Sequence, residues 1–475
     1  MFIFLHGHMR TFSLFSIAVV SLVFLLPSNA LHAQSASSDR PNIIFVMADD
    51  LGYADLGSYG QEQIDTPNLD RMASQGMRFT DHYSGHTVCR PSRLVLRTGL
   101  HSGHTPIHGN TDYALPPKAR ITAKLLKKAG YVVGGVGKWA LNGRNAQDPN
   151  ASGAPTKQGF DMWFGYLNQI AAHNYWPEFL WKNDTKVKLK NKVDYADSGY
   201  AKGLAGTATK KVDYSHDLMM DQAFQFIQDH RNQPFFLQMH ITIPHANNQG
   251  KPHGMEVPDV GKYKRKDWPE PEKGFAGMIR RLDRDMGRLF QLLQKLNLDR
   301  ETIVFFTSDN GPHSEGGHKH TFFDSNGPLR GYKRDLYEGG IRVPMIVRWP
   351  GKIEPGTVTD HASAFWDVMP TLCELAGVQP PEDIDGISFL PELLGRSEKQ
   401  QTHDYLYWAF KGKRALRKGP WKLVRPGGNK PVELYNLNKD IGEQNDRSGK
   451  RPELTKKLKK WMKRAHDPSE LPKMK

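Results

Sequence analysis

The sequence predicts an α/β protein with a large, mixed but mostly parallel sheet sandwiched by helices, and a small C-terminal domain with a short antiparallel sheet and one helix. The first observation is a set of continuous apolar runs, at 41–48, 234–245 and 301–308. Such runs are typical of strands buried on both faces, as the strands of parallel sheets are. The second is that amphipathic helical stretches separate these runs, and the third is that the runs become short and aromatic beyond residue 404. Short runs of that kind favour antiparallel strands.

Strands and helices are expected to alternate along most of the chain. After the strand at 41–48, a helix is predicted at 121–129, followed through Gly130 by a strand at 131–137. Further elements follow as a helix at 217–229, a strand at 234–245, a helix at 275–296 and a strand at 301–308. Runs at 404–410, 421–425 and 432–437 predict the C-terminal sheet. The closing helix, 452–465, has an apolar stripe that packs inward, and its lysines form a solvated face.

Length and charge limit the possible functions. The 475 residues are enough for one large or two ordinary domains with a substantial core. Lys and Arg number 65 against 50 Asp and Glu, and the net charge of +15 predicts attraction to polyanions such as nucleic acid, anionic lipid or sulfated polysaccharide. No nucleic-acid recognition motif accompanies the basic residues, so we expect no nucleic-acid partner.

The N-terminus predicts export, to the periplasm or the exterior. An apolar run from Phe12 to Leu26 is followed by Pro27 and by small-residue cleavage sites ending at Ala30 or Ala33. This pattern is typical of a signal peptide, with an uncleaved membrane anchor as the alternative. No later apolar run is long enough to span a bilayer, so we expect no stable membrane span after cleavage. We therefore assign 1–33 to the signal peptide, 34–396 to the α/β domain and 397–475 to the C-terminal subdomain.

The chain has two cysteines, Cys89 and Cys373, and so differs from small exported proteins built on disulfides. Cys373 lies in an apolar helical context, where we expect it to be buried. Cys89 directly precedes an apolar run that is predicted to be helical, and the field at a helix N-terminus favours an anion. A lone cysteine is also often a small core residue.

Polar oxygen ligands follow two of the predicted strands. Asp49 and Asp50 come after the first strand, and Asp309 and Asn310 come after the strand at 301–308. Ligands of open α/β sheets bind at the carboxyl ends of the strands. Carboxylate and amide oxygens suit a hard divalent cation, whereas the thiolate and imidazole sets of structural zinc are missing here. We prefer calcium because the ligands are many and anionic, and magnesium stays an alternative.

Cations and one histidine occupy comparable positions. Lys138 follows a glycine-rich strand, and Lys333 lies in a glycine-rich segment where backbone can approach a ligand closely. Both are candidates for binding an anion. His245 ends an apolar run and is the best acid/base candidate, because histidine exchanges a proton near neutral pH. His240, within the same run, is interpreted as a core residue.

The segment Cys89-Arg90-Pro91-Ser92-Arg93 has Pro two residues and Arg four residues after the cysteine. With the segments around Asp49, Lys138, His245, Asp309 and Lys333, it resembles the motifs of type I sulfatases, including arylsulfatase A-like proteins, in the alkaline phosphatase superfamily. The resemblance extends from Pro41 to about Glu443. It implies an alkaline phosphatase-like sheet and the hydrolysis of sulfate esters.

The resemblance also implies roles for single residues. A formylglycine-generating or equivalent maturation enzyme would oxidise Cys89 to formylglycine, whose hydrate attacks sulfur. One calcium ion would be bound by the modified residue 89 and by Asp49, Asp50, Asp309 and Asn310. Arg93 would hold the formylglycine and Lys138 and Lys333 the sulfate oxygens, while His245 would protonate the leaving alcohol, directly or through Lys333.

One position departs from the family, and the substrate is less defined than the reaction. Ala140 stands where many sulfatases have a histidine that assists the second half-reaction. Either His104 or His173 replaces that histidine, or the hydrate is deprotonated by other means. A rim of aromatic and imidazole groups favours a sulfated carbohydrate, weakly of the galactose type, by resemblance to bacterial carbohydrate sulfatases. The rim residues are His173, Tyr175, Trp176, His318 and His320. Tyr175 and Trp176 are equally well explained as core residues.

Two other functions fit part of the pattern. A phosphodiesterase or phosphonate hydrolase of the same superfamily uses related ligands, although two lysines without a further metal site favour monoanionic sulfate. A non-catalytic protein that binds sulfated glycans would fit Ala140 and the positive net charge.

Overall fold

The computed structural model describes residues 40–143 and 147–466, and the expected signal peptide lies outside these ranges. The main sheet has ten strands in the order β13-β2-β12-β11-β1-β10-β4-β5-β6-β7. In that order the strands are Thr357–Thr359, Met77–Phe79, Met345–Arg348, Thr302–Ser308, Asn42–Ala48, Phe235–His240, Val132–Lys138, Met162–Tyr166, Phe179–Lys182 and Thr185–Lys188. The five strands from β11 to β5 are parallel to one another, and antiparallel pairs flank them. The mixed, mostly parallel sheet is therefore confirmed.

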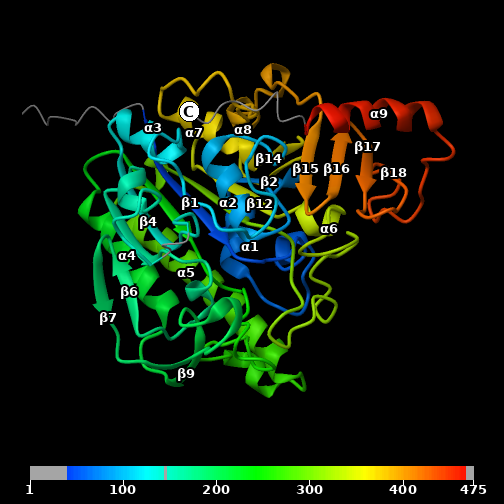
Figure 1. The fold of residues 1–475 in the computed structure, drawn as a ribbon. Coiled ribbons are helices and arrows are strands. Elements are labelled where there is room, and N and C mark those ends of the chain that lie inside the picture. The colour runs from blue at the N-terminus through cyan, green and yellow to red at the C-terminus, as the bar shows by residue number, and fades with distance from the viewer. Residues whose placement is uncertain (1–39, 144–146, 467–475) are drawn as a thin grey trace, which may run out of the picture. The chain divides into compact units, whose positions relative to one another are not determined.

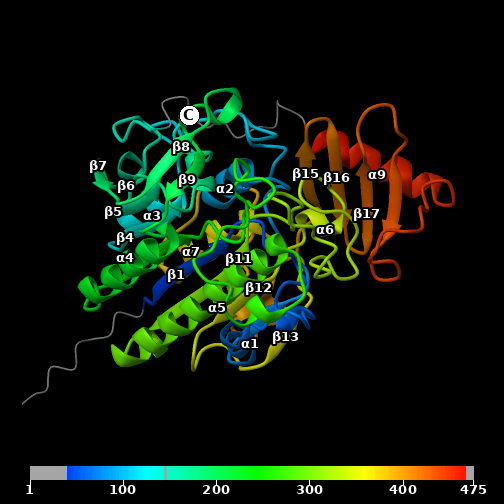
Figure 2. The ribbon, with the colours of Figure 1, turned by 90° about the horizontal axis from the view of Figure 1, so that it is seen from below.

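Helices cover both faces of this sheet, and β1 runs between α7 and α5 (Figures 1 and 2). One face packs on α2 (Cys89–Thr98), α3 (Thr122–Lys128), α7 (Val368–Leu375) and α8 (Leu390–Leu393). The other packs on α1 (Pro67–Ser74), α4 (Ser215–Asp229) and α5 (Glu270–Lys295). Alternate residues of β1 belong to the two cores, with Phe45 in one and Val46 in the other. This is why the run reads as continuously apolar.

The C-terminal sheet is antiparallel, and α9 (Pro452–Arg464) lies along it (Figure 1). Its strands are β15 (Leu406–Phe410), β16 (Lys413–Lys418), β17 (Trp421–Arg425) and β18 (Glu433–Asn436). Trp408 and Val424 on one face join the core of the main sheet, while Leu416 and Leu423 on the other pack with α9. The prediction omitted β16, because four of its six residues are charged and only the pair at its centre is apolar.

Further differences lie at element ends. The predicted strand at 234–245 is wrong beyond His240, where β10 ends. Residues 241–245 continue as an irregular segment, which contains Pro244, a residue that cannot donate to a neighbouring strand. Helix α5 begins five residues earlier than predicted, with acidic residues and a proline in its first turn that suit a helix N-terminus.

Smaller elements complete the fold. Two-stranded sheets pair β3 (His82–Tyr83) with β14 (Ser363–Ala364) and β8 (Lys192–Tyr195) with β9 (Gly206–Lys210). The short helix α6 (Glu338–Ile341) follows the glycine-rich segment that carries Lys333. Among the described helices, none combines the length and apolar character that crossing a membrane requires.

Candidate active site

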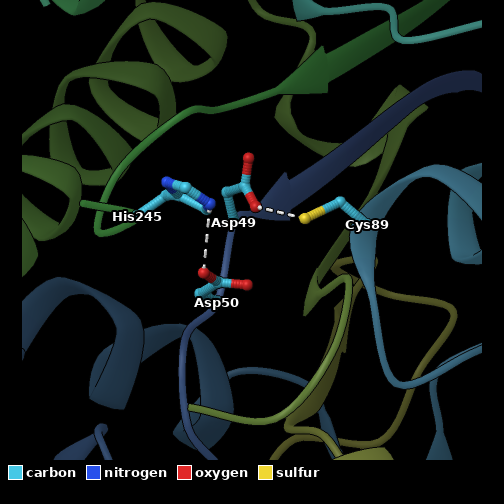
Figure 3. A group of neighbouring side chains, drawn as sticks. All are labelled: Asp49, Asp50, Cys89 and His245. Atoms are coloured by element: carbon cyan, nitrogen blue, oxygen red, sulfur yellow. Dashed lines mark hydrogen bonds and ion pairs between the residues drawn. The ribbon is translucent and has the colours of Figure 1, made fainter. Parts of the chain in front are cut away.

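The predicted ligands meet at one edge of the main sheet. Strands β11, β1, β10 and β4 are adjacent and parallel, so their carboxyl ends share that edge. Asp309 follows β11, Asp49 follows β1 and Lys138 ends β4. The segment after β10 delivers His245, and Cys89 begins α2 at the same place (Figure 3).

Cys89 lies against the Asp49 carboxylate. Its Sγ is 3.4 Å from Asp49 Oδ1 (Figure 3). The other carboxylate oxygen accepts from Lys138 Nζ at 2.6 Å and lies 3.3 Å from Arg93 Nη2. Burial raises the pKa of the Cys89 thiol well above its ordinary value, and the Asp49 charge adds to this. Burial alone would also raise the pKa of Asp49, but Lys138, His245 and Arg93 hold it well below its ordinary value.

Arg93 holds this part of the site together from within the core. It is fully buried and donates to Asp309 Oδ2 at 2.7 Å and to the Lys138 carbonyl at 3.0 Å. Its other neighbour is the buried His240 ring, with 3.3 Å from Arg93 Nη1 to Nδ1. One guanidinium therefore ties α2 to the ends of β11 and β4.

Asp50 organises the second half of the site. Its Oδ2 accepts from Lys333 Nζ at 2.6 Å and lies 3.4 Å from His245 Nε2 (Figure 3). Its Oδ1 accepts from Asn310 Nδ2 at 2.6 Å. Lys333 Nζ also lies 3.2 Å from both His245 Nε2 and Glu315 Oε2. Burial alone would lower the pKa of Lys333, but the Asp50 and Glu315 carboxylates hold it above its ordinary value.

The oxygen donors fit a bound hard cation. Asp49, Asp50 and Asp309 are all buried within this one site. Burial and the neighbouring Asp49 charge raise the pKa of Asp309 to about 7, against the attraction of Arg93, as expected for crowded carboxylates. Asn310 Oδ1 is buried and has no hydrogen-bond partner within the described residues. A buried unpaired acceptor beside three carboxylates is an arrangement that a calcium or magnesium ion satisfies.

One ring nitrogen of His245 is hydrogen-bonded to the backbone, and the other faces the site. Its Nδ1 lies 2.7 Å from the Ala246 carbonyl and donates to it, which directs Nε2 toward Lys333 and Asp50. The ring stacks on His173, with centroids 4.3 Å apart. Burial lowers the pKa of His245 well below its ordinary value, and the Lys333 ammonium adds to this.

The predicted rim residues divide into two groups. His173 lies beside the site through its stacking on His245, and His320 is half-buried and stacks on the exposed Tyr332. Tyr175 is instead fully buried, with its hydroxyl donating to the Thr242 carbonyl. Trp176 packs against Tyr214 in the same core.

His318 is buried as well, which corrects its placement on a rim. Its ring stacks on Phe275 at 3.8 Å between centroids, and its Nδ1 is 2.5 Å from Glu272 Oε2. His318 therefore fixes the glycine-rich loop to α5. The local sequence does not distinguish the two histidines, because His318 and His320 lie two residues apart in the same polar loop.

The structure places Glu315 and His104 differently from what their local sequence indicates. Glu315 pairs with both Lys333 and Arg334, but a lone glutamate in a polar loop carries no signal of that role. His104, a candidate replacement for the histidine missing at Ala140, contacts Asp385 at 2.8 Å. The Asp385 backbone N–H donates to the carbonyl of Gly99, which follows the C-terminal end of α2, whereas Cys89 begins that helix. His104 is therefore not beside the site.

The main sheet is covered by helices on both faces and carries buried carboxylates at its carboxyl edge, two of them paired with lysines. This arrangement is typical of an enzyme that acts on anionic esters. Residues 41–378 match the family profile described as Sulfatase, and residues 319–467 match that described as N-sulphoglucosamine sulphohydrolase, C-terminal. The chain belongs to the sulfatase family and is a sulfuric ester hydrolase.

Relatives and solved structures agree with this assignment. The chain is 30% identical to N-acetylgalactosamine-6-O-sulfatase of Bacteroides thetaiotaomicron, over 89% of this chain and 92% of that one. It is 34% identical to N-acetylgalactosamine-6-sulfatase of Rattus norvegicus, over 80% and 71%. Among solved structures, Ps i-CgsB in complex with k-i-k-neocarrahexaose is similar with a TM-score of 0.73 and 29% identity, covering 90% of this chain and 94% of that one.

Proposed function

We propose that this sulfatase releases sulfate from a sulfated carbohydrate, using a formylglycine derived from Cys89 and one calcium ion. A galactose-type residue is the favoured sugar. The observation that carries the proposal is the position of Cys89. Its Sγ lies at the start of α2, 3.4 Å from a buried carboxylate oxygen that belongs to a cluster of oxygen donors and cations. The names of the relatives support a carbohydrate substrate.

The ion would be held by the oxygens of Asp49, Asp50, Asp309 and Asn310 and by the modified residue 89. The same donors also accept magnesium. When bound, such an ion withdraws charge from the sulfate oxygens as a Lewis acid. The unpaired Asn310 Oδ1 supports this donor set.

The covalent step begins with the hydrate that replaces the Cys89 thiol after a maturation enzyme has oxidised it to the aldehyde. This hydrate would supply the oxygen that displaces the sugar oxygen from sulfur, and Asp49, whose Oδ1 lies 3.4 Å from Cys89 Sγ, would accept the proton of that hydroxyl. Lys138 and Lys333 hold the sulfate oxygens, and Arg93 keeps Asp49 in place. Charges fixed in advance around a developing charge lower the barrier, by roughly 10²- to 10³-fold in rate for each good contact.

The leaving sugar oxygen takes a proton from the pair formed by His245 and Lys333, whose nitrogens are 3.2 Å apart. In the second half-reaction a base would take the proton of the other hydroxyl, which would let sulfate leave as the aldehyde re-forms. We assign this proton transfer to His173, because Ala140 cannot accept a proton and His173 stacks on His245 within the site. We also place His173 and His320 at the sugar, whereas Tyr175, Trp176 and His318 support the pocket from the core.

We also propose a domain division and an exported location for this protein. We assign residues 34–396 to the catalytic domain and 397–475 to the C-terminal subdomain. The N-terminal segment supports export to the periplasm or the exterior through a signal peptide ending at Ala30 or Ala33.

The proposed function is tested by sulfate release from defined sulfated monosaccharides and oligosaccharides, with matched phosphate esters as controls. We expect release from a sulfated galactose or N-acetylgalactosamine and none from the phosphates. Faster turnover of the phosphates would contradict the proposal.

Removal of the ion should abolish activity and lower stability together. In EGTA we expect sulfate release to stop and the free energy of unfolding to fall by about 2.7 kcal/mol from its value in calcium at about 100 times Kd, because binding to the folded state alone stabilises it. Differential scanning fluorimetry and sulfate release are measured in parallel, and each metal is then added back. Full activity in EGTA would rule out a required calcium ion, because EGTA binds calcium far more tightly than magnesium, and recovery with magnesium but not calcium would rule it out as well.

Substitution of His245 should have an effect that depends on the leaving group. His245→Ala is expected to lower kcat on a sugar sulfate by roughly 10²- to 10⁴-fold, the range typical of a general acid. On an aryl sulfate with an acidic phenol the loss should be much smaller, because that leaving group needs no proton. The exposed His253→Ala serves as the control. Equal losses on both substrates would show that His245 is not the proton donor.

A further inference from the structure

The positive charge of this protein is concentrated in its C-terminal part. Residues 404–466 contain 18 Lys and Arg but only 6 Asp and Glu, a net charge of +12 out of +15 for the whole chain. This stretch forms the antiparallel sheet and α9. The remainder of the chain is nearly balanced, so the field that attracts polyanions originates chiefly here.

Helix α9 presents much of this charge on one face. Lys456, Lys457, Lys459, Lys460 and Lys463 are all exposed, and within the described residues none of them forms an ion pair. At 100° per residue they cover less than half of the helix circumference. We call these five residues the α9 lysine face.

The opposite face of α9 is already occupied. Leu458 and Met462 are buried against Leu416 and Leu423 of the sheet. A basic helix that inserts into lipid needs a free apolar face, and α9 has none to offer. Its charged face is therefore suited to an electrostatic partner in solution.

We propose that the α9 lysine face binds the polymer chain of a sulfated polysaccharide, outside the site that cleaves it. This proposal rests on the proposed function for the nature of the polymer. A sulfated chain carries regularly spaced charges, and its binding to fixed lysines releases counterions, as with other polyanions. Five unpaired lysines on a rigid helix are a complementary surface.

The same sheet also contacts the active-site loop. Lys413 Nζ, at the start of β16, donates to the Arg334 carbonyl at 2.9 Å, and Arg334 follows Lys333. A polymer held on this subdomain would keep its own sulfate esters at high local concentration near the site. The lysine face should therefore lower KM for polymers and leave small substrates unaffected.

The test replaces all five lysines with glutamine, which keeps helix propensity. The matched control replaces five exposed lysines spread over other elements, at 118, 128, 295, 352 and 399, and so removes the same net charge. Binding to dextran sulfate and to uncharged dextran is measured at several salt concentrations. We expect dextran sulfate binding to weaken by roughly tenfold or more in the α9 variant, with a smaller salt dependence, and by much less in the control.

Binding is measured in proteins that also carry Cys89→Ala, so the result does not depend on catalysis. Turnover is measured in variants that keep Cys89. The α9 variant should turn over a monosaccharide sulfate at a rate within about twofold of the unsubstituted protein. Its KM for a sulfated polymer should be about tenfold higher. A triple variant, Lys456→Gln with Lys460→Gln and Lys463→Gln, should show a smaller loss, and thermal unfolding of each variant checks its fold.

Equal weakening in both variants would overturn the proposal, because only net charge would then matter. Tighter binding to phosphatidylglycerol vesicles or duplex DNA than to dextran sulfate would overturn it as well. Absence of sulfate release by the unsubstituted protein would count against the proposed function, and polymer binding would still be decided by the comparison of the two variants.

Discussion

Cys89→Ala should reduce sulfate release by roughly 10⁴-fold or more, the loss seen when a catalytic nucleophile is removed. The physical reason is that alanine offers no oxygen to attack sulfur, while the cations that bind sulfate stay in place. We therefore expect substrate to bind but not to turn over. The measurement is a single-turnover assay of sulfate release together with equilibrium binding of the sulfated sugar.

Cys373→Ala is the matched control, because the chain has only these two cysteines. Cys373 is also buried, but it lies in α7 within the apolar core. We expect its removal to cost stability by leaving a small cavity and to leave the rate per folded molecule unchanged. A Cys89→Ala protein with more than a few per cent of normal turnover would contradict covalent catalysis at residue 89.

Lys422→Met should lower the free energy of unfolding by about 3–5 kcal/mol, the range for breaking a buried ion pair. Lys422 is fully buried, 2.8 Å from Glu338 Oε1 and 2.9 Å from Glu443 Oε1. Methionine would fill the space, leave the buried Glu443 carboxylate without its cation, and leave Glu338 with Arg342 alone. Urea unfolding monitored by tryptophan fluorescence gives the free energy.

The exposed Lys430→Met is the control and should change stability by less than about 0.5 kcal/mol. Burial already raises the pKa of Glu443 to about 7, against the attraction of Lys422. A carboxyl whose pKa is raised on folding binds its proton more tightly in the folded state, so stability falls as pH rises through the window between its unfolded and folded pKa. The loss in the free energy of unfolding caused by Lys422→Met should therefore be larger at pH 8 than at pH 5. A deficit below about 1 kcal/mol at pH 8 would contradict this account.

Much of the fold and site could be predicted because the signals are local. The run before Asp49 is apolar at every position from Ile43 to Ala48, since β1 is covered on both faces, and such a run is visible without tertiary information. The shared edge of the sheet then follows from parallel topology. Asp49, Asp309 and Lys138 meet there for that reason.

What escaped prediction depends on contacts between distant segments. Strand β16 is held by its neighbours in the sheet, and its own sequence is mainly charged. His318 and His320 lie two residues apart in the same loop, yet only the tertiary packing of Phe275 buries the first. The Lys422 cluster joins residues more than 80 positions apart, which no spacing rule in a single sequence could indicate.

The central claim is that residue 89 acts as a formylglycine, and peptide mass spectrometry of the active protein tests it most directly. The peptide containing residue 89 is compared with the same peptide from Cys89→Ala, after treatment with a carbonyl reagent and with a thiol reagent. We predict that the active protein carries an aldehyde at residue 89 that reacts with the carbonyl reagent. Protein that releases sulfate at full rate with an unmodified thiol at residue 89 would contradict the account.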